Sequence, residues 1–258
     1  MIDLLTELEK FNYITYYDAP HKYFVEGNEM ISATTFIGKF EKPFDTDFWA
    51  GKKAKEWGET IDEVKAKWKL KADIACEKGT VSHEYLENLL AKKVYPYPAV
   101  QIQSLFEGTD PVKDKFAKIV KLMNSFAEDI RGKMIPVKSE FIVGDRDYGI
   151  CGMIDQIFYN TKSGMLEIWD WKTNEKMTTE SKYKLLHPVD HLGDSKLDIY
   201  SLQLSLYKSI IERNTNLKIG ACYLTWFNEE NDKYKIFKCH DYTKEIGAMV
   251  DFWKSNRQ

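Results

Sequence analysis

Cysteine is scarce in this sequence and is never spaced for metal binding. The chain has four cysteines in 258 residues, and no two of them form a CxxC pair: Cys76, Cys151, Cys222 and Cys239. This spacing excludes a zinc ribbon and supplies no ligand set for an iron–sulfur cluster. We expect free thiols, buried or partly buried, in a reducing compartment.

Long apolar runs and an excess of positive charge are also missing. No segment approaches the roughly 20 apolar residues that span a bilayer, and the acidic start MIDLLTELEK is unlike a secretory signal. We therefore expect a cytoplasmic protein without membrane contact. The formal net charge is −3, which argues mildly against a nucleic-acid binder without excluding one.

The N-terminal half has mostly helical patterns around one hairpin. Residues 1–10 predict a short amphipathic helix, and residues 21–32 predict a β-hairpin that turns at Glu26, Gly27 and Asn28. Ser32 then caps a helix that begins near Thr34. Most of 46–93 and 112–131 has helical spacing, and 94–111, rich in proline and glycine, predicts a loop.

The C-terminal half changes to alternating patterns. Residues 137–144, 149–159 and 165–173 alternate, and the turn sequences DRDYG and NTKSG separate them, which predicts a three-stranded antiparallel meander. A helix over 198–214, strands over 218–227 and 233–238, and a helix over roughly 243–255 follow. This order predicts an α+β core, with helices packed around a sheet.

Two carboxylates and a lysine stand out in these strands. Asp170 and Lys172 are two residues apart and share a face, and pairing through NTKSG brings Asp155 near Asp170. Close carboxylates repel, and Mg²⁺ or Mn²⁺, which prefer oxygen ligands, would resolve the conflict. Such an ion can activate water and polarise a phosphoryl oxygen, while the lysine neutralises charge. The alternative is a surface ion pair, but strands this apolar disfavour it.

These residues and their order resemble the PD-(D/E)xK nuclease superfamily, and more finely its RecB-like branch of phage, mitochondrial and Cas4-like nucleases. The resemblance rests on Asp155 and Asp170-Trp171-Lys172, and further on His83, Glu140, Gly149, Gly152, Gln203 and Tyr207. Two departures are Ile154, where proline is common, and Asp170, where many relatives have glutamate. The cysteine spacing does not support the iron–sulfur cluster that some relatives carry.

The resemblance implies roles for the helical residues. His83 would add a nitrogen ligand beside Asp155 and Asp170, and Glu87, one helical turn from His83, would reach a second metal or orient the histidine. Glu140 either supports the ligands without touching the ion or is merely exposed on an edge strand.

A second pair shares one helical turn farther along the chain. Gln203 and Tyr207 would donate hydrogen bonds to a phosphate or hold Lys172 in place. Their alternative is ordinary helix packing, with Tyr207 as a half-buried aromatic residue.

Candidate DNA contacts lie in two further segments. Lysines alternate with tryptophans over 46–93, a pattern that suits a phosphate backbone and stacked bases but also a solvated face. The loop over 173–197 follows Lys172 directly and is longer than most connections. The residues chosen from these segments are Lys52, Lys53, Trp57, Lys176 and Lys182.

The resemblance implies a restriction-endonuclease-like core, a central mixed sheet flanked by helices. We treat 1–258 as one nuclease domain, with a hairpin and helical wall over 1–135 and the catalytic sheet and helices over 136–258. The predicted function is a Mg²⁺- or Mn²⁺-dependent DNA exonuclease that acts on single strands or ends, with replication or recombination proteins as possible partners, in the host cytoplasm if phage-encoded. The alternatives are a structure-specific endonuclease, an inactive DNA-binding module, and an unrelated α+β protein.

Overall fold

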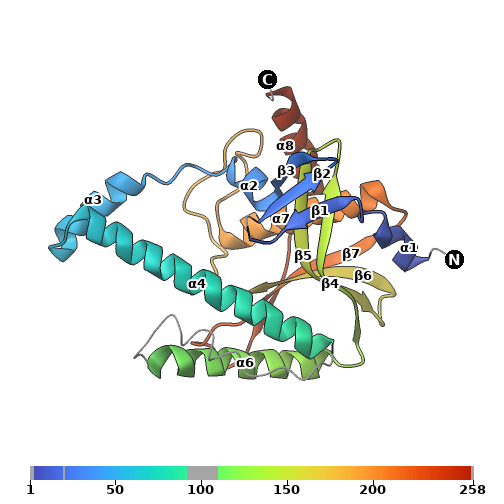
Figure 1. The fold of residues 1–258 in the computed structure, drawn as a ribbon, viewed down its shortest axis with the longest axis horizontal. Coiled ribbons are helices and arrows are strands. Elements are labelled where there is room, and N and C mark those ends of the chain that lie inside the picture. Colours follow the sequence, from blue (N-terminus) through green and yellow to red (C-terminus); the bar gives the residue numbers. More distant parts are fainter. Residues whose placement is uncertain (1–2, 20, 92–109, 257–258) are drawn as a thin grey trace.

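The computed structural model describes residues 3–19, 21–91 and 110–256 (Figure 1). Its strands are β1 (Ile14–Tyr17), β2 (Lys22–Val25), β3 (Asn28–Ser32), β4 (Met134–Asp145), β5 (Ile150–Asn160), β6 (Met165–Lys172), β7 (Ile219–Trp226) and β8 (Lys235–Lys238). Its helices are α1 (Leu4–Glu9), α2 (Ala33–Gly38), α3 (Thr46–Trp57), α4 (Ile61–Leu90), α6 (Asp110–Ile130), α7 (Lys196–Asn214) and α8 (Thr243–Ser255).

One mixed sheet contains all eight described strands. Its order is β1-β2-β3-β5-β6-β7-β8, and β4 pairs with β5 beside this path. The pairs β3–β5 and β6–β7 are parallel, and the other pairs are antiparallel. The predicted α+β class with a central mixed sheet and flanking helices is therefore confirmed, as is the antiparallel meander β4–β5–β6.

The N-terminal hairpin joins this sheet through its third strand. Its turn has Glu26 at φ 52° and Gly27 at φ 82°, the left-handed pair that a two-residue hairpin turn requires. Strand β3 then pairs with Ile150 and Cys151 of β5. The hairpin thus extends the sheet, and its side chains also pack on β4 and β5.

The predicted helices are present, with small changes at their ends. Ser32 caps α2, as expected, and its hydroxyl accepts the Thr35 N–H. Gly58 ends α3 in the left-handed conformation, and Thr60 starts α4 with a capping box to Glu63. The predicted loop over 94–111 lies outside the described residues up to 109, and residues 110 and 111 already belong to α6.

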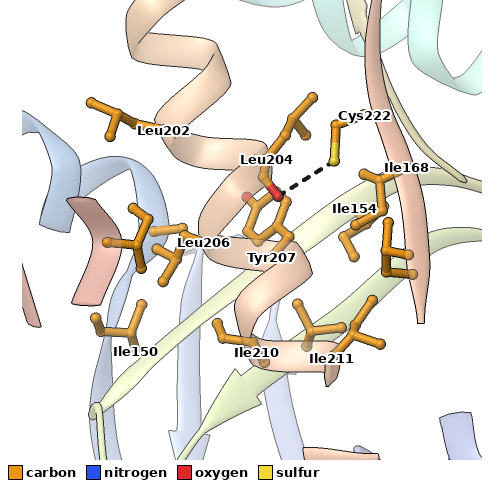
Figure 2. Close-up of a cluster of buried hydrophobic side chains, with 14 of the residues drawn as sticks. Ile150, Ile154, Ile168, Leu202, Leu204, Leu206, Tyr207, Ile210, Ile211 and Cys222 are labelled. Carbon is orange, nitrogen blue, oxygen red and sulfur yellow. Dashed lines mark hydrogen bonds between the residues drawn. The ribbon is translucent and has the colours of Figure 1, made fainter. Parts of the chain in front are cut away.

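Two apolar clusters cover the two sides of the sheet. One includes α7 and α8, and Figure 2 shows side chains of α7 such as Leu206 and Ile210 packed against Ile150 and Ile154 of the sheet. The other places α4 and α6 against aromatic residues such as Trp169 and Trp171. The sheet is therefore held between two helical layers, and α4 brings its C-terminal half to the strand ends.

Two further expectations concern membrane-spanning helices and the burial of the cysteines. None of the described helices is long and apolar enough to cross a membrane. Cys151, Cys222 and Cys239 are buried free thiols, whereas Cys76 is exposed. The expectation of at least partial burial is therefore wrong for Cys76, which lies on the solvent side of α4.

Candidate active site

The candidate site lies where β5 and β6 separate. The β5–β6 ladder ends at Gln156 and Trp169, so its next two opposed residues are Asp155 and Asp170. There the Asp155 carboxylate accepts the N–H of Trp171 at 2.7 Å, which replaces the lost backbone pairing. Asp155 and Asp170 are both nearly inaccessible to solvent. The two carboxylates meet at this gap, as the spacing predicts.

Helix α4 brings His83 to the same point. Its Nδ1 lies 3.6 Å from Asp155 Oδ2 and 3.7 Å from Glu140 Oε1. Its Nε2 lies 3.2 Å from the carbonyl oxygen of Trp171. Because a carbonyl can only accept, Nε2 is the donor, and Nδ1 is left facing the carboxylates.

Glu140 completes this group from β4. Potential ligand atoms of His83, Glu140 and Asp155 all lie within 4.8 Å of one another, the single such group of three that the described residues contain. Glu140 has φ 45°, a left-handed conformation that costs a residue with a Cβ about 1–2 kcal/mol. The strained residue of β4 is therefore the one whose carboxylate faces His83 and Asp155.

Lys172 lies beside Asp170, as their spacing predicts. Its Nζ is 2.5 Å from Asp170 Oδ2, yet this oxygen accepts no hydrogen bond of good geometry and is buried. The ring of Tyr200, on α7, lies 4.6 Å from the ammonium and holds it by a cation–π contact. Sequence reasoning missed Tyr200, although it stands three residues before Gln203 on the same helix.

Burial and mutual charge shift the pKa of Asp155, Asp170, His83 and Lys172. Burial raises the pKa of Asp155, and it raises that of Asp170 to about 6 against the opposing effect of Lys172. Burial opposes the charge on His83, but the carboxylates of Asp155 and Glu140 outweigh it and raise the pKa to about 9. Burial also opposes the charge on Lys172, and Asp170 and Asp155 raise its pKa nevertheless. The negative charges therefore dominate the site.

The residues present fit a divalent cation. Three carboxylates and one ammonium leave two uncompensated negative charges when His83 is neutral. Asp170 supplies a buried carboxylate whose Oδ2 pairs with Lys172, and the other ligands are two carboxylates and an imidazole nitrogen. Carboxylate oxygens with few nitrogen ligands suit Mg²⁺ and Mn²⁺.

Other predicted residues lie around the group rather than in it. Glu87 is not a member of the His83 group. Gln203 donates from Nε2 to the Tyr207 hydroxyl at 3.1 Å, so their contact is with each other, and Lys172 is held by Tyr200 instead. Tyr207 is fully buried rather than half-buried, and a Cβ added at Gly152 would lie 2.4 Å from its ring.

The predicted DNA contacts differ in their surroundings. Lys52 lies over the Trp49 ring, and Lys53 is paired with Glu56 at 2.7 Å. Lys53 and Lys67 both lie over the ring of Trp57, which is 43% exposed. Lys182 lines a pocket between the α2–α3 linker and the loop after β6. Lys176 is exposed in that loop, where its carbonyl accepts the Asn174 amide.

Comparisons with known proteins identify a family for the chain but not its site residues. Ribonuclease 3 of Caenorhabditis elegans is 27% identical over 100 residues, which cover 37% of this chain and 9% of that protein. The crystal structure of SSO0001 matches 69% of this chain and 86% of its own with a TM-score of 0.28 and 12% identity. The model of the PD-(D/E)XK nuclease superfamily matches residues 16–246. The chain belongs to the PD-(D/E)XK nuclease superfamily.

Proposed function

We propose that the protein is a Mg²⁺- or Mn²⁺-dependent deoxyribonuclease that hydrolyses phosphodiester bonds as an exonuclease. The observation that carries the proposal is the group of His83, Glu140 and Asp155 beside the buried pair of Asp170 and Lys172. Membership of a nuclease superfamily supports the reaction class.

The side chains have distinct tasks in this proposal. Asp155, Asp170, Glu140 and His83 Nδ1 would hold the cation, and the bound ion would supply an activated water and charge neutralisation at the phosphate. The Trp171 backbone orients two of these groups, because its N–H binds Asp155 and its carbonyl binds His83.

Lys172 has the task of neutralising the developing negative charge. Its raised pKa keeps the ammonium protonated at neutral pH, so it can stabilise a pentavalent phosphoryl group but cannot serve as a general base. Tyr200 restricts where the ammonium can move. Asp170 therefore holds Lys172 through an ion pair at its Oδ2, and its carboxylate would also face the cation.

The resemblance of the motif order to the RecB-like branch supports exonuclease action in this proposal; the order runs through His83, Asp155, Asp170, Lys172 and the pair Gln203–Tyr207. A structure-specific endonuclease on the same core and an inactive DNA-binding module are the competing functions. The geometry favours an active enzyme over the binding module, because each acidic position of the motif lies at the gap between β5 and β6.

End-labelled linear DNA and covalently closed circles, each incubated with Mg²⁺, Mn²⁺ or EDTA, test the proposal. We expect the linear DNA to be degraded from an end, the circles to persist, and EDTA to stop the reaction reversibly. Cleavage of circles would establish the endonuclease instead. Retained DNA binding without cleavage of either substrate would establish the binding module, and cleavage in excess EDTA would exclude the metal site.

Lys172→Met tests the site residues, with Lys208→Met as its matched control. Both lysines are mostly buried, at 18% and 15% exposure, and both pair with an aspartate, Lys172 with Asp170 and Lys208 with Asp241. We expect Lys172→Met to lose cleavage by a factor of about 100 or more and Lys208→Met to keep it. Equal activity of the two variants, at equal thermal stability, would contradict the assignment.

A further inference from the structure

An aromatic pocket lies beside the candidate active site and outside the residues assigned to it. Phe44, Trp49 and Tyr183 line it, together with Lys42 and Lys182, and its volume is about 520 Å³. Phe44 and Tyr183 are 64% and 56% exposed, an unusual position for large rings in a folded protein. We call these five residues the aromatic pocket.

The rings of the pocket are arranged to receive a flat group. Phe44 and Trp49 are nearly parallel, with an interplanar angle of 8° and centroids 6.4 Å apart. Trp68 packs against Phe44 at 6.1 Å and supports it from α4. Parallel aromatic faces that are open to solvent suit stacking of nucleic-acid bases, whatever the base sequence.

The walls of the pocket are fixed before any ligand binds. Asp194 Oδ1 accepts the N–H groups of Lys182 and Tyr183 at 2.9 and 3.0 Å. The Leu186 N–H donates to the Phe40 carbonyl at 2.7 Å, which ties the loop after β6 to the linker before α3. A preformed pocket loses little conformational entropy on binding.

The lysines around the pocket are available for phosphate. Lys42 lies over the Tyr183 ring at 5.6 Å and Lys52 over the Trp49 ring at 5.2 Å. Among the residues that the structure describes, Lys42, Lys52 and Lys182 form no ion pair with a carboxylate. Six other lysines along α3 and α4 do form such pairs: Lys53, Lys65, Lys67, Lys69, Lys71 and Lys78. The combination of unpaired cations with open rings matches a chain of phosphates and bases.

The pocket also lies near the catalytic lysine. The hydroxyl of Ser181, which precedes Lys182 in the loop that lines the pocket, donates to Asp198 Oδ2 on α7 at 3.2 Å. Tyr200 follows two residues later on α7 and contacts Lys172. Helix α7 therefore connects the pocket to the side chain that would contact the scissile phosphate.

We propose that the aromatic pocket binds unpaired bases of a single-stranded nucleic acid next to the bond that is cut. This assignment rests on the proposed nuclease function and adds its substrate class. A base can stack on the exposed rings of Phe44 and Tyr183 only if it is not paired, so the pocket selects single strands and frayed ends over intact duplex.

Binding measurements in EDTA test the pocket without hydrolysis. The probes are a fluorescent oligothymidylate and a blunt DNA hairpin, measured by anisotropy at fixed salt. The test variant is Phe44→Ala/Tyr183→Ala, and the control is Tyr17→Ala, an equally open ring at 54% exposure on β1. We expect the test variant to weaken oligothymidylate binding by about tenfold or more, with hairpin binding unchanged and the control like the wild type.

A series of oligothymidylates with one abasic position each locates the contact. The position that lies in the pocket should weaken wild-type binding as much as the double substitution does, and the double variant should lose nothing further there. Equal loss for hairpin and single strand, or no loss for either, would overturn the assignment; the second result would point to a protein partner.

Cleavage assays separate this inference from the proposed function. If the wild type cuts DNA but the pocket variant binds and cuts single strands normally, the pocket assignment fails and the nuclease stands. If no substrate is cut while the binding pattern holds, the nuclease proposal fails and the pocket remains a single-strand binding site.

Discussion

The contact between Gly152 and Tyr207 gives a prediction whose size follows from the structure. A Cβ at position 152 would lie 2.4 Å from Tyr207 Cε1 and 2.8 Å from its hydroxyl. Tyr207 is buried in the cluster drawn in Figure 2, so its ring cannot swing into solvent. Overpacking of this kind costs about 1–3 kcal/mol, and this contact, far inside normal limits, belongs at the upper end.

Two opposing effects then set the change in the free energy of unfolding for Gly152→Ala. Alanine is favoured over glycine in a strand by about 0.5–1 kcal/mol, since it restricts the unfolded chain. We therefore expect a net loss of about 2 kcal/mol in the free energy of unfolding, measured by urea denaturation. In a Tyr207→Leu background the clash is removed, and Gly152→Ala should become neutral or slightly stabilising there.

Gly247→Ala is the control, because a Cβ at this position on α8 meets nothing within 4 Å. It should stabilise the protein by up to about 1 kcal/mol. The reasoning is refuted if Gly152→Ala is as stable as the wild type, or if its cost is the same with Leu at position 207.

Two further predictions concern carboxylates away from the site. Asp145 is buried and accepts hydrogen bonds from Arg213 and from the Asn214 amide, both at 2.9 Å. Asp145→Ala should therefore lower the free energy of unfolding in urea by about 2–3 kcal/mol. The control Asp147→Ala, at an exposed position, should lower it by at most about 1 kcal/mol. Hydrogen bonds from Lys208 and Thr243 lower the pKa of Asp241 to about 2. The folded pKa lies below the unfolded one, so this stabilisation is present above about pH 4 and is lost as the pH falls towards 2. Because Asp241 is more than half exposed, screening limits it to about 1 kcal/mol, and the stability difference from Asp241→Asn should shrink over that range; a constant difference would contradict the assignment.

Local signals explain why so much of the fold could be predicted. The turn at Glu26 and Gly27, the Ser32 cap and the two turns of the meander are each encoded within a few residues. The break between α3 and α4 was not predicted within 46–93, although its signals are equally local: Gly58 ends α3, and the Thr60–Glu63 capping box starts α4. The pairing of distant strands could not be predicted in this way, because nothing in residues 21–32 shows that β3 would pair with β5.

The same distinction holds for the site. Asp155, Asp170 and Lys172 could be placed together because a two-residue spacing and one hairpin turn fix their geometry. Tyr200 required knowing that α7 crosses over β6, although its spacing from Gln203 offered a signal. The aromatic pocket joins two segments nearly 140 residues apart, Phe44 and Tyr183, and no periodic pattern encodes such a contact.

Glu140 is the residue whose role sequence reasoning left open, and its strain makes the proposed role testable. At φ 45° glycine is favoured over alanine by about 1 kcal/mol, so Glu140→Gly should be more stable than Glu140→Ala in urea. At Lys138, in the same strand without positive φ, the order should reverse. Both Glu140 variants should lose stabilisation by Mn²⁺, since the carboxylate is gone. Stabilisation by Mn²⁺ that survives in both variants would show that Glu140 is not a ligand.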